Sequence, residues 1–143
     1  MKKIILFVAL ATFSMAFNAC SSDDSDSSKK AGSITLTIDG TTKTFNTVVI
    51  TDYSEMGQVR VTASIGDDTT EIIEFTAYKE QLGAHAVFSF EYTINGIKYN
   101  GNSLVILTQV NSDNKLKGSF SGTLSNSPNN IKNVTDGTFS INY

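Results

Sequence analysis

The 143-residue chain has no tryptophan and only one cysteine, one histidine and one proline. A single cysteine excludes both a disulfide framework within one chain and a cysteine-rich zinc site. Basic residues are also few, with 11 Lys and Arg against 14 Asp and Glu and a formal charge of −3. A nucleic-acid partner is therefore not expected, because proteins that bind nucleic acids carry a basic face. We also expect no metal and no other cofactor.

What the chain does contain is enough apolar and aromatic material for one folded domain. Hydrophobic residues make up 40% of it and aromatic residues 10%, which argues against disorder of the whole chain. Its length is typical of a single domain.

The N-terminus carries the pattern of an export signal. Lys2 and Lys3 precede an uncharged apolar run over residues 4–19, which is short for a membrane span. The run ends at Ala19-Cys20, and a small residue directly before a lone cysteine resembles the lipobox of bacterial lipoproteins. The resemblance implies that residues 1–19 are removed and that Cys20 carries a diacylglyceryl group and an N-linked fatty acyl chain such as palmitate. Cleavage after Ala16 is the alternative, and it would leave Cys20 as a free thiol.

Residues 20–32 read CSSDDSDSSKKAG and contain no large apolar side chain, so we interpret them as a flexible tether. Asp23, Asp24 and Asp26 resemble the acidic export signal on surface lipoproteins of one Gram-negative phylum. This resemblance implies an outer-membrane protein that is anchored through the lipid on Cys20 and faces the cell exterior. Retention at the periplasmic face is the alternative.

From residue 33 to residue 143 the hydrophobic pattern has a period of two. Ile34, Leu36 and Ile38 alternate with polar residues, and Asp39-Gly40 and Asn95-Gly96 are typical of hairpin turns. Short strands between such turns predict an all-β domain, an antiparallel β-sandwich of about 8–9 strands. A lipocalin-like closed barrel is the alternative.

The pattern also predicts which side chains point inward. Phe88, Phe90 and Tyr92 share one face of a predicted strand, and Leu107 lies in a strongly apolar one. In a sandwich these residues fill the core, whereas in a barrel they line a ligand cavity of roughly 300 Å³ or more. In residues 116–124, leucine, glycine and phenylalanine share one parity, and we expect the glycines to face large side chains from an opposite sheet.

Three segments carry a family resemblance: ITLTIDGTTKTF at 34–45, KGSFSGTL at 117–124 and VTDGTFSINY at 134–143. They resemble the opening hairpin and the closing strands of small β-sandwich surface lipoproteins of bacteria whose function is unassigned. The resemblance implies a fold and a lipid anchor, and it implies no active site.

Residues suited to catalysis are few, and we expect no enzyme. His85 is the only histidine, and no Gly-x-Ser-x-Gly motif accompanies it. A glycosidase pair needs two carboxylates about 5–10 Å apart. The alternating pattern places Glu74 and Glu91 on a solvent-exposed face, and there is no tryptophan to line a sugar site. Glu71 and Glu80 are the other two candidates.

The expected function is that of a non-catalytic module for binding, adhesion or accessory roles, with a glycan or protein ligand. If exposed, Tyr53, Tyr78 and Tyr99 are the candidate contact residues, because aromatic side chains stack on sugars and anchor protein partners. Thr69 is a candidate O-glycosylation site, since Asp68-Thr69-Thr70 resembles an acceptor used in that phylum. The alternatives are a carrier of a small apolar ligand and, where a sheet edge is exposed, assembly by strand donation.

Overall fold

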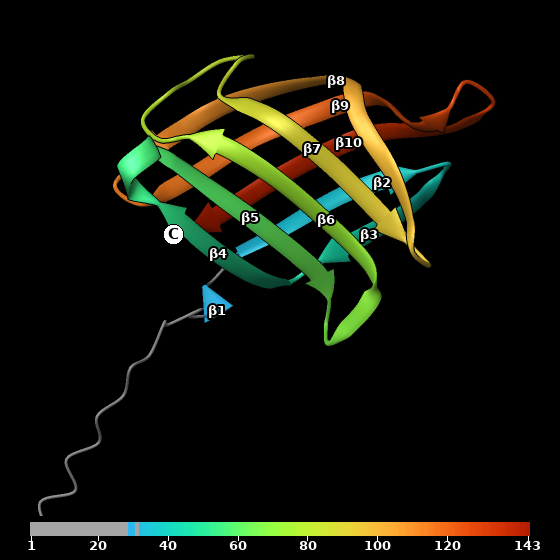
Figure 1. Ribbon diagram of the computed structural model, residues 1–143, viewed down its shortest axis with the longest axis horizontal. Coiled ribbons are helices and arrows are strands. Elements are labelled where there is room, and N and C mark those ends of the chain that lie inside the picture. The colour runs from blue at the N-terminus through green and yellow to red at the C-terminus, as the bar shows by residue number, and fades with distance from the viewer. Residues whose placement is uncertain (1–28, 31) are drawn as a thin grey trace, which may run out of the picture.

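The computed structural model describes residues 29–30 and 32–143 of the chain (Figure 1). Cys20, the signal segment and most of the predicted tether lie outside the described residues. Within them the all-β prediction is confirmed. The elements are β1 (Lys29–Lys30), β2 (Gly32–Ile38), β3 (Thr41–Phe45), β4 (Thr47–Tyr53), the 3₁₀ helix η1 (Ser54–Met56), β5 (Gln58–Ile65), β6 (Asp68–Tyr78), β7 (Val87–Ile94), β8 (Ile97–Ser112), β9 (Lys115–Ser127) and β10 (Asn130–Asn142).

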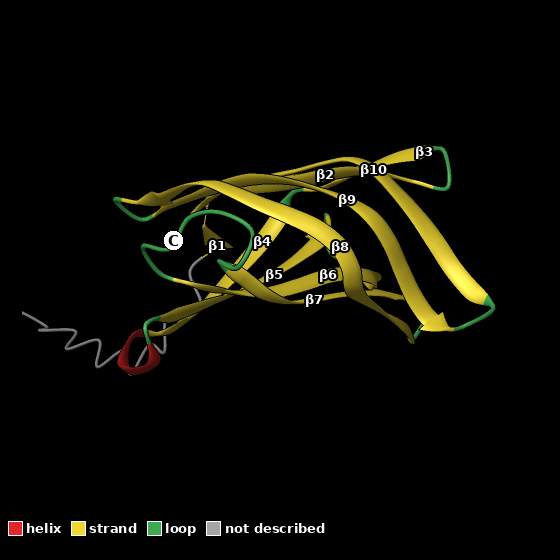
Figure 2. Cartoon of the chain, turned by 90° about the horizontal axis from the view of Figure 1, so that it is seen from above, coloured by secondary structure: helices red, strands yellow, loops and turns green. Residues whose placement is uncertain are grey.

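All strands belong to one antiparallel sheet in the order β1-β4-β5-β6-β7-β8-β9-β10-β2-β3. Only Asn46 separates β3 from β4, so the two form one bent strand, whose first half pairs with β2 and whose second half pairs with β5. This bent strand brings the two margins of the sheet together. The result is a nearly closed, barrel-like sheet, with β2, β9 and β10 across the interior from β5, β6 and β7 (Figure 2). The barrel alternative thus describes the architecture better than two separately packed sheets.

The hairpin turns follow from local chemistry. Asp39-Gly40 and Asn95-Gly96 have positive φ at both residues, 49° and 82° in the first turn and 50° and 78° in the second. Two-residue turns of this kind match the right-handed twist of the strands they connect, and asparagine, aspartate and glycine tolerate positive φ best. The predicted β2–β3 and β7–β8 hairpins are therefore confirmed.

Aromatic rings fill the interior. Phe75 lies 5.3 Å from Phe139 and 6.0 Å from Phe90, and Phe90 lies 5.1 Å from Phe120, measured between ring centroids. These four rings come from β6, β7, β9 and β10, so they join opposite walls of the barrel. Each fully buried ring contributes about 1.5–3 kcal/mol through the hydrophobic effect. Phe90 and Tyr92 point inward as predicted, and both belong to the packed core, as the sandwich interpretation expects for inward side chains.

Two inward predictions are wrong. Phe88 is 49% exposed, because Thr76 pairs with Ser89 and Ala77 pairs with Val87, which leaves Phe88 as the extra residue of a β-bulge. Leu107 is 46% exposed, and its neighbours Ile106 and Thr108 point inward instead.

The inward parity of residues 116–124 is confirmed, but the expected partners of its glycines are wrong. Gly118 lies directly opposite Phe139, which belongs to the neighbouring strand β10 of the same sheet. The single twisted sheet allows a ring to lie across its own cross-strand neighbour, so no second sheet is needed to cover the glycine.

Candidate functional site

The barrel wall has an opening between β7 and β8, which we call the window. Ladder pairs join these strands only from Glu91–Asn100 to Ile94–Ile97. Across the window, no ladder pair in the described part of the chain joins residues 87–90 to residues 101–107. Beyond it the wall is joined again, since Gly83 N–H donates to Thr108 O at 2.9 Å and Thr108 N–H donates to Gly83 O at 3.2 Å.

Two β-bulges produce the window. On β8, Asn100 pairs with Ser125 and Ser103 pairs with Thr123, so two residues of β8 stand against one of β9. The bulge turns β8 away from β7, and Figure 1 shows this strand changing direction between its short first part and its longer second part. Gly101 lies at the bend and still abuts β7, since a Cβ atom there would come within 2.8 Å of Phe90 Cβ, so the window opens only beyond this residue. The second bulge, at Phe88, interrupts the regular pairing of β7 with β6.

A cavity of about 220 Å³ occupies the window. Its lining residues come from both strands and from the β6–β7 loop: Ala84, Val87, Phe88, Ser89, Phe90, Gly101, Asn102, Leu104 and Ile106. Phe90 and Ile106, each 8% exposed, are inward-facing members of the core. The window therefore leads from solvent to the aromatic interior.

Exposed aromatic side chains lie beside the window. The rings of Tyr78 and Phe88 are 4.6 Å apart, and the two residues are 38% and 49% exposed. Tyr53 pairs with Gln58 and Gln58 pairs with Tyr78, so Tyr53 stands on the same outer face two strands away, about 10 Å from Tyr78. We call Tyr53, Tyr78 and Phe88 the aromatic row. Exposed aromatic side chains grouped beside an opening in the wall are typical of binding surfaces.

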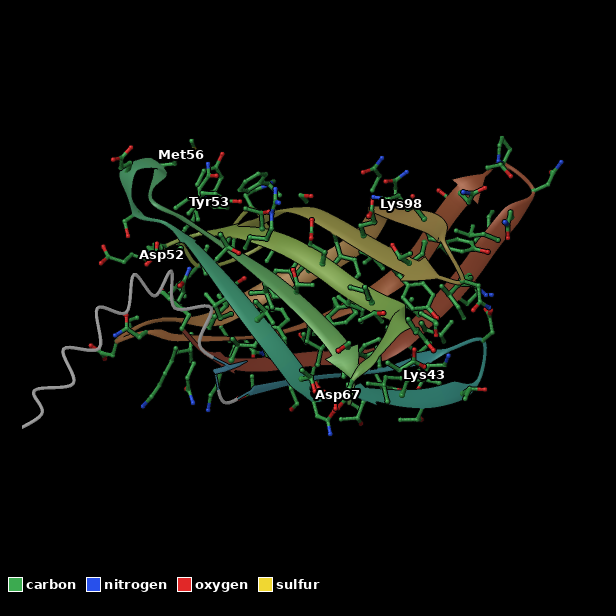
Figure 3. All side chains as sticks on the ribbon, turned by 60° about the horizontal axis from the view of Figure 1, so that its bottom comes forward. Lys43, Asp52, Tyr53, Met56, Asp67 and Lys98 are labelled. Carbon is green, nitrogen blue, oxygen red and sulfur yellow. The ribbon has the colours of Figure 1, made fainter. Side chains whose placement is uncertain are left out.

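The structure thus brings together two of the three predicted contact tyrosines. Tyr53 is half-buried beneath the Arg60 guanidinium, which lies 5.5 Å from its ring centroid, and Figure 3 shows it near Asp52 and Met56. Tyr99 is only 5% exposed, and its hydroxyl donates to Asn130 Oδ1 at 3.1 Å. Tyr99 therefore does not meet the condition of exposure on which its role as a contact residue depends.

Phe88 is an exposed aromatic residue that sequence reasoning placed inward. Val87 and Phe88 are both apolar, so a period of two cannot decide which of them points inward. The bulge that turns Phe88 outward depends on how β6 and β7 pair, and this pairing involves contacts between distant segments.

Next to the window, a buried amide holds the β6–β7 loop in place. Asn111 is 3% exposed, and its Nδ2 donates to the main-chain oxygens of Tyr78 at 2.6 Å and Gln81 at 2.8 Å. Its Oδ1 accepts from the Tyr143 hydroxyl at 3.0 Å. The nearby Thr108 Oγ1 is buried without a hydrogen-bond partner. Asn111 thus fixes the loop segment that borders the window.

Polar residues at the opposite end of the barrel form a structural network. Glu71 accepts from Lys43 Nζ and from the Tyr92 hydroxyl, each at 2.5 Å. Burial, followed by the hydrogen bond and charge of Glu71, raises the pKa of Tyr92 far above its usual value. Figure 3 shows Lys43 and Lys98 away from the end that carries Met56. Glu71 thus links Lys43 of β3 to Tyr92 of β7, which is the role of a residue that stabilises the fold.

The other candidate carboxylates lie on the outer surface. Glu74 and Glu91 are cross-strand partners on β6 and β7, as the solvent-face interpretation predicts. Glu74 pairs with Arg60 at 3.7 Å and Glu91 with Lys98 at 2.8 Å, so cations offset their mutual repulsion. Glu80 and His85 are exposed in the β6–β7 loop.

Thr69 is exposed at the beginning of β6, where a glycosyl group would meet solvent. Its neighbour Thr70 donates its main-chain N–H to Asp68 Oδ1 at 2.8 Å, which fixes the turn. The hydrogen bond of Asp68 with the Thr70 side chain, followed by this main-chain hydrogen bond, lowers the pKa of Asp68. The candidate acceptor thus stands on an ordered hairpin.

Residues 29–30 and 32–143 contain no group of three or more His, Cys, Asp or Glu side chains placed to hold a metal ion. The same residues contain no helix of the length and apolarity that a membrane span requires. Comparisons of the chain with protein-family models, with curated proteins and with solved structures give no match.

Proposed function

We propose that this chain is a lipid-anchored protein of the outer membrane, facing the cell exterior, whose β domain serves as a non-catalytic binding module. The window and the aromatic row form its contact surface. The observation that carries the proposal is the approach of Tyr78 and Phe88 to an opening in a wall that is hydrogen-bonded above and below it. Covering exposed aromatic rings next to an open cavity removes apolar surface from water, which stabilises a complex with a partner.

The energetics favour this surface as a binding site. Removing apolar surface from water contributes about 25 cal/mol per Å². Aromatic residues at the centre of an interface commonly contribute 2 kcal/mol or more each, as estimated from alanine substitutions. Tyr78 and Phe88 are pre-positioned by contact with each other, so little side-chain entropy is lost when a ligand covers them.

A carrier of a small apolar ligand is the weaker proposal. The barrel-like architecture favours it, but the cluster of Phe75, Phe90, Phe120 and Phe139 occupies the interior where such a ligand would lie. The window offers about 220 Å³, below the roughly 300 Å³ that small-molecule pockets usually provide. A ligand that covers the opening from outside fits this geometry better than one that is enclosed.

The anchor rests on the sequence resemblance at Cys20 and on the acidic run that follows. It is tested by expressing the full chain and the Cys20→Ser variant in a Gram-negative host that exports surface lipoproteins, followed by mass spectrometry and cell fractionation. We expect an acylated N-terminal cysteine and outer-membrane association for the natural chain, and loss of both in the variant. A free thiol at position 20 of the natural protein would contradict the anchor.

The contact surface is tested separately with purified protein on panels of glycans and of peptides. Phe88→Ser should abolish binding of any ligand found. Ile65→Ser, which changes an exposed apolar residue (37%) at the end of β5 away from β7 and β8, should leave binding unchanged. Equal binding by both variants would contradict the assignment of the window and the aromatic row.

A further inference from the structure

We propose that a groove on the outer face of the barrel, beside the window, binds a neutral oligosaccharide. This inference rests on the proposed function and names the ligand class of an extended contact surface. The groove has a volume of about 360 Å³ and lies over β8, β9 and the beginning of β10. Asn102 lines both the groove and the window, so the two hollows are adjacent.

The β-bulge of β8 gathers polar side chains in the groove. Asn100 pairs with Ser125 and Ser103 pairs with Thr123, so two polar cross-strand pairs lie next to each other on the outer face. A regular strand turns every second side chain inward. Here Asn100, Asn102 and Ser103 are all exposed, because the bulge changes the parity of the strand between them. Three side chains from four consecutive positions therefore reach one groove.

The chemistry of the lining identifies a neutral ligand that carries many hydroxyl groups. Seven of the nine lining side chains carry an amide or a hydroxyl group, and none of the nine is charged. Amides and hydroxyls both donate and accept hydrogen bonds, which matches the hydroxyl groups of a sugar. A phosphate or carboxylate ligand is usually held by Arg or Lys. A wholly apolar ligand would cover the polar groups without giving them hydrogen-bond partners.

The two remaining lining side chains, Pro128 and Ile131, supply an apolar surface. Ile131 is 52% exposed and lies beside Ser125, its cross-strand partner on β9. A sugar ring presents C–H groups on its faces, so contact with Ile131 removes apolar surface of both partners from water. The groove also has the size of a ligand site, since small-molecule pockets occupy roughly 300–1,000 Å³.

Hydrogen bonds hold the β9–β10 hairpin, which forms one side of the groove. Asn126 Nδ2 donates to the main-chain oxygen of Lys98 at 2.8 Å, and the Tyr99 hydroxyl donates to Asn130 Oδ1 at 3.1 Å. Figure 1 shows this hairpin at the end of the barrel opposite η1. The side of the groove is thus fixed before a ligand arrives, which reduces the entropy lost on binding.

The test titrates the full chain with soluble neutral oligosaccharides of glucose, mannose and xylose and follows the main-chain amide signals by NMR. We expect at least one of them to bind, with signal shifts concentrated in residues 100–103 and 123–131. Oligogalacturonate, which carries a carboxylate on each sugar, serves as the charged comparison and should not shift these signals. The mapping requires no variant, so it remains decisive even where a substitution affects folding.

Matched variants measure the contribution of single side chains. Asn102→Ala and Ser103→Ala each remove one hydrogen-bonding group at an exposed position of the groove, and each should weaken binding about fivefold. Ser121→Ala changes an exposed residue of β9 that does not line the groove and should leave the affinity unchanged. Equal affinities of all three variants would overturn the assignment of the groove.

The outcomes separate this inference from the proposed function. Signal shifts confined to other residues, or binding of oligogalacturonate alone, would overturn the neutral saccharide site. A peptide ligand that is lost in Phe88→Ser, with no oligosaccharide bound, would overturn this inference and support the window and the aromatic row. An oligosaccharide that stays in the groove of Phe88→Ser would support this inference and contradict the aromatic row. Absence of any ligand, saccharide or peptide, would overturn both.

Discussion

Gly118 of β9 and Phe139 of β10 are direct cross-strand partners, and the phenylalanine ring occupies the space that a side chain at position 118 would fill. A Cβ atom at Gly118 would lie 2.3 Å from Phe139 Cζ and 2.4 Å from the Leu107 carbonyl oxygen. The arrangement is reciprocal, because Gly137 of β10 lies opposite Phe120 of β9. The paired glycines let both rings reach the aromatic core.

Gly118→Ala should therefore destabilise the domain. The added methyl group meets both a ring and the main chain of β8, and overpacking of this kind costs about 1–3 kcal/mol of unfolding free energy. Urea denaturation measures the change, with Ser121→Ala, at an exposed position of the same strand, as the matched control. An unchanged midpoint for Gly118→Ala would contradict the close packing of Phe139.

Aspartate substitutions at two adjacent residues of β8 test the inward parity of that strand. Ile106→Asp should prevent folding, because an isolated buried carboxylate costs several kcal/mol out of a total stability of about 5–15 kcal/mol. Leu107→Asp changes a half-exposed side chain and should cost less than about 1 kcal/mol. Circular dichroism melting curves compare them, and the reverse order would mean that the parity of β8 is inverted.

The pH dependence of stability should report on Tyr92. Burial and Glu71 raise the pKa of Tyr92 far above its ordinary value of 10.0. Above pH 10 the unfolded chain releases this proton while the folded chain keeps it, so the contribution of Tyr92 to stability is complete below pH 10 and decreases as the pH rises further. Tyr92→Phe should flatten this alkaline loss, measured as unfolding free energy between pH 8 and about pH 11. The matched control is Tyr78→Phe, at the half-exposed aromatic row. An alkaline limb identical in natural protein and Tyr92→Phe would contradict the assignment.

Thr108→Val should leave the domain equally stable or make it more stable by up to about 1 kcal/mol. Thr108 is 2% exposed and its Oγ1 has no hydrogen-bond partner, so the natural residue carries a desolvation cost that valine of similar shape avoids. Thermal unfolding measures the difference. A clear loss of stability would show that the hydroxyl group has a partner, such as a buried water molecule.

The sequence predicted local features well. The Asp39-Gly40 and Asn95-Gly96 turns depend on the conformational preferences of neighbouring residues, and the inward set from Leu116 to Leu124 follows from simple alternation. Distinguishing a sandwich from a barrel was not feasible, because this depends on the bend at Asn46, which no residue pattern marks. The window was also beyond prediction. It arises from bulges at Phe88 and at Gly101, and a bulge depends on the register between strands rather than on either strand alone.

The account depends most directly on the open edge of β8, and amide hydrogen exchange of the free full chain, resolved by residue with NMR, measures it. Among residues 101–107, the amides that point away from β9 should exchange with solvent at least tenfold faster than the ladder amides of residues 116–121 on β9. Uniformly slow exchange throughout residues 101–107 would mean that β7 and β8 are paired along their full length, and it would contradict both the window and the binding site assigned to it.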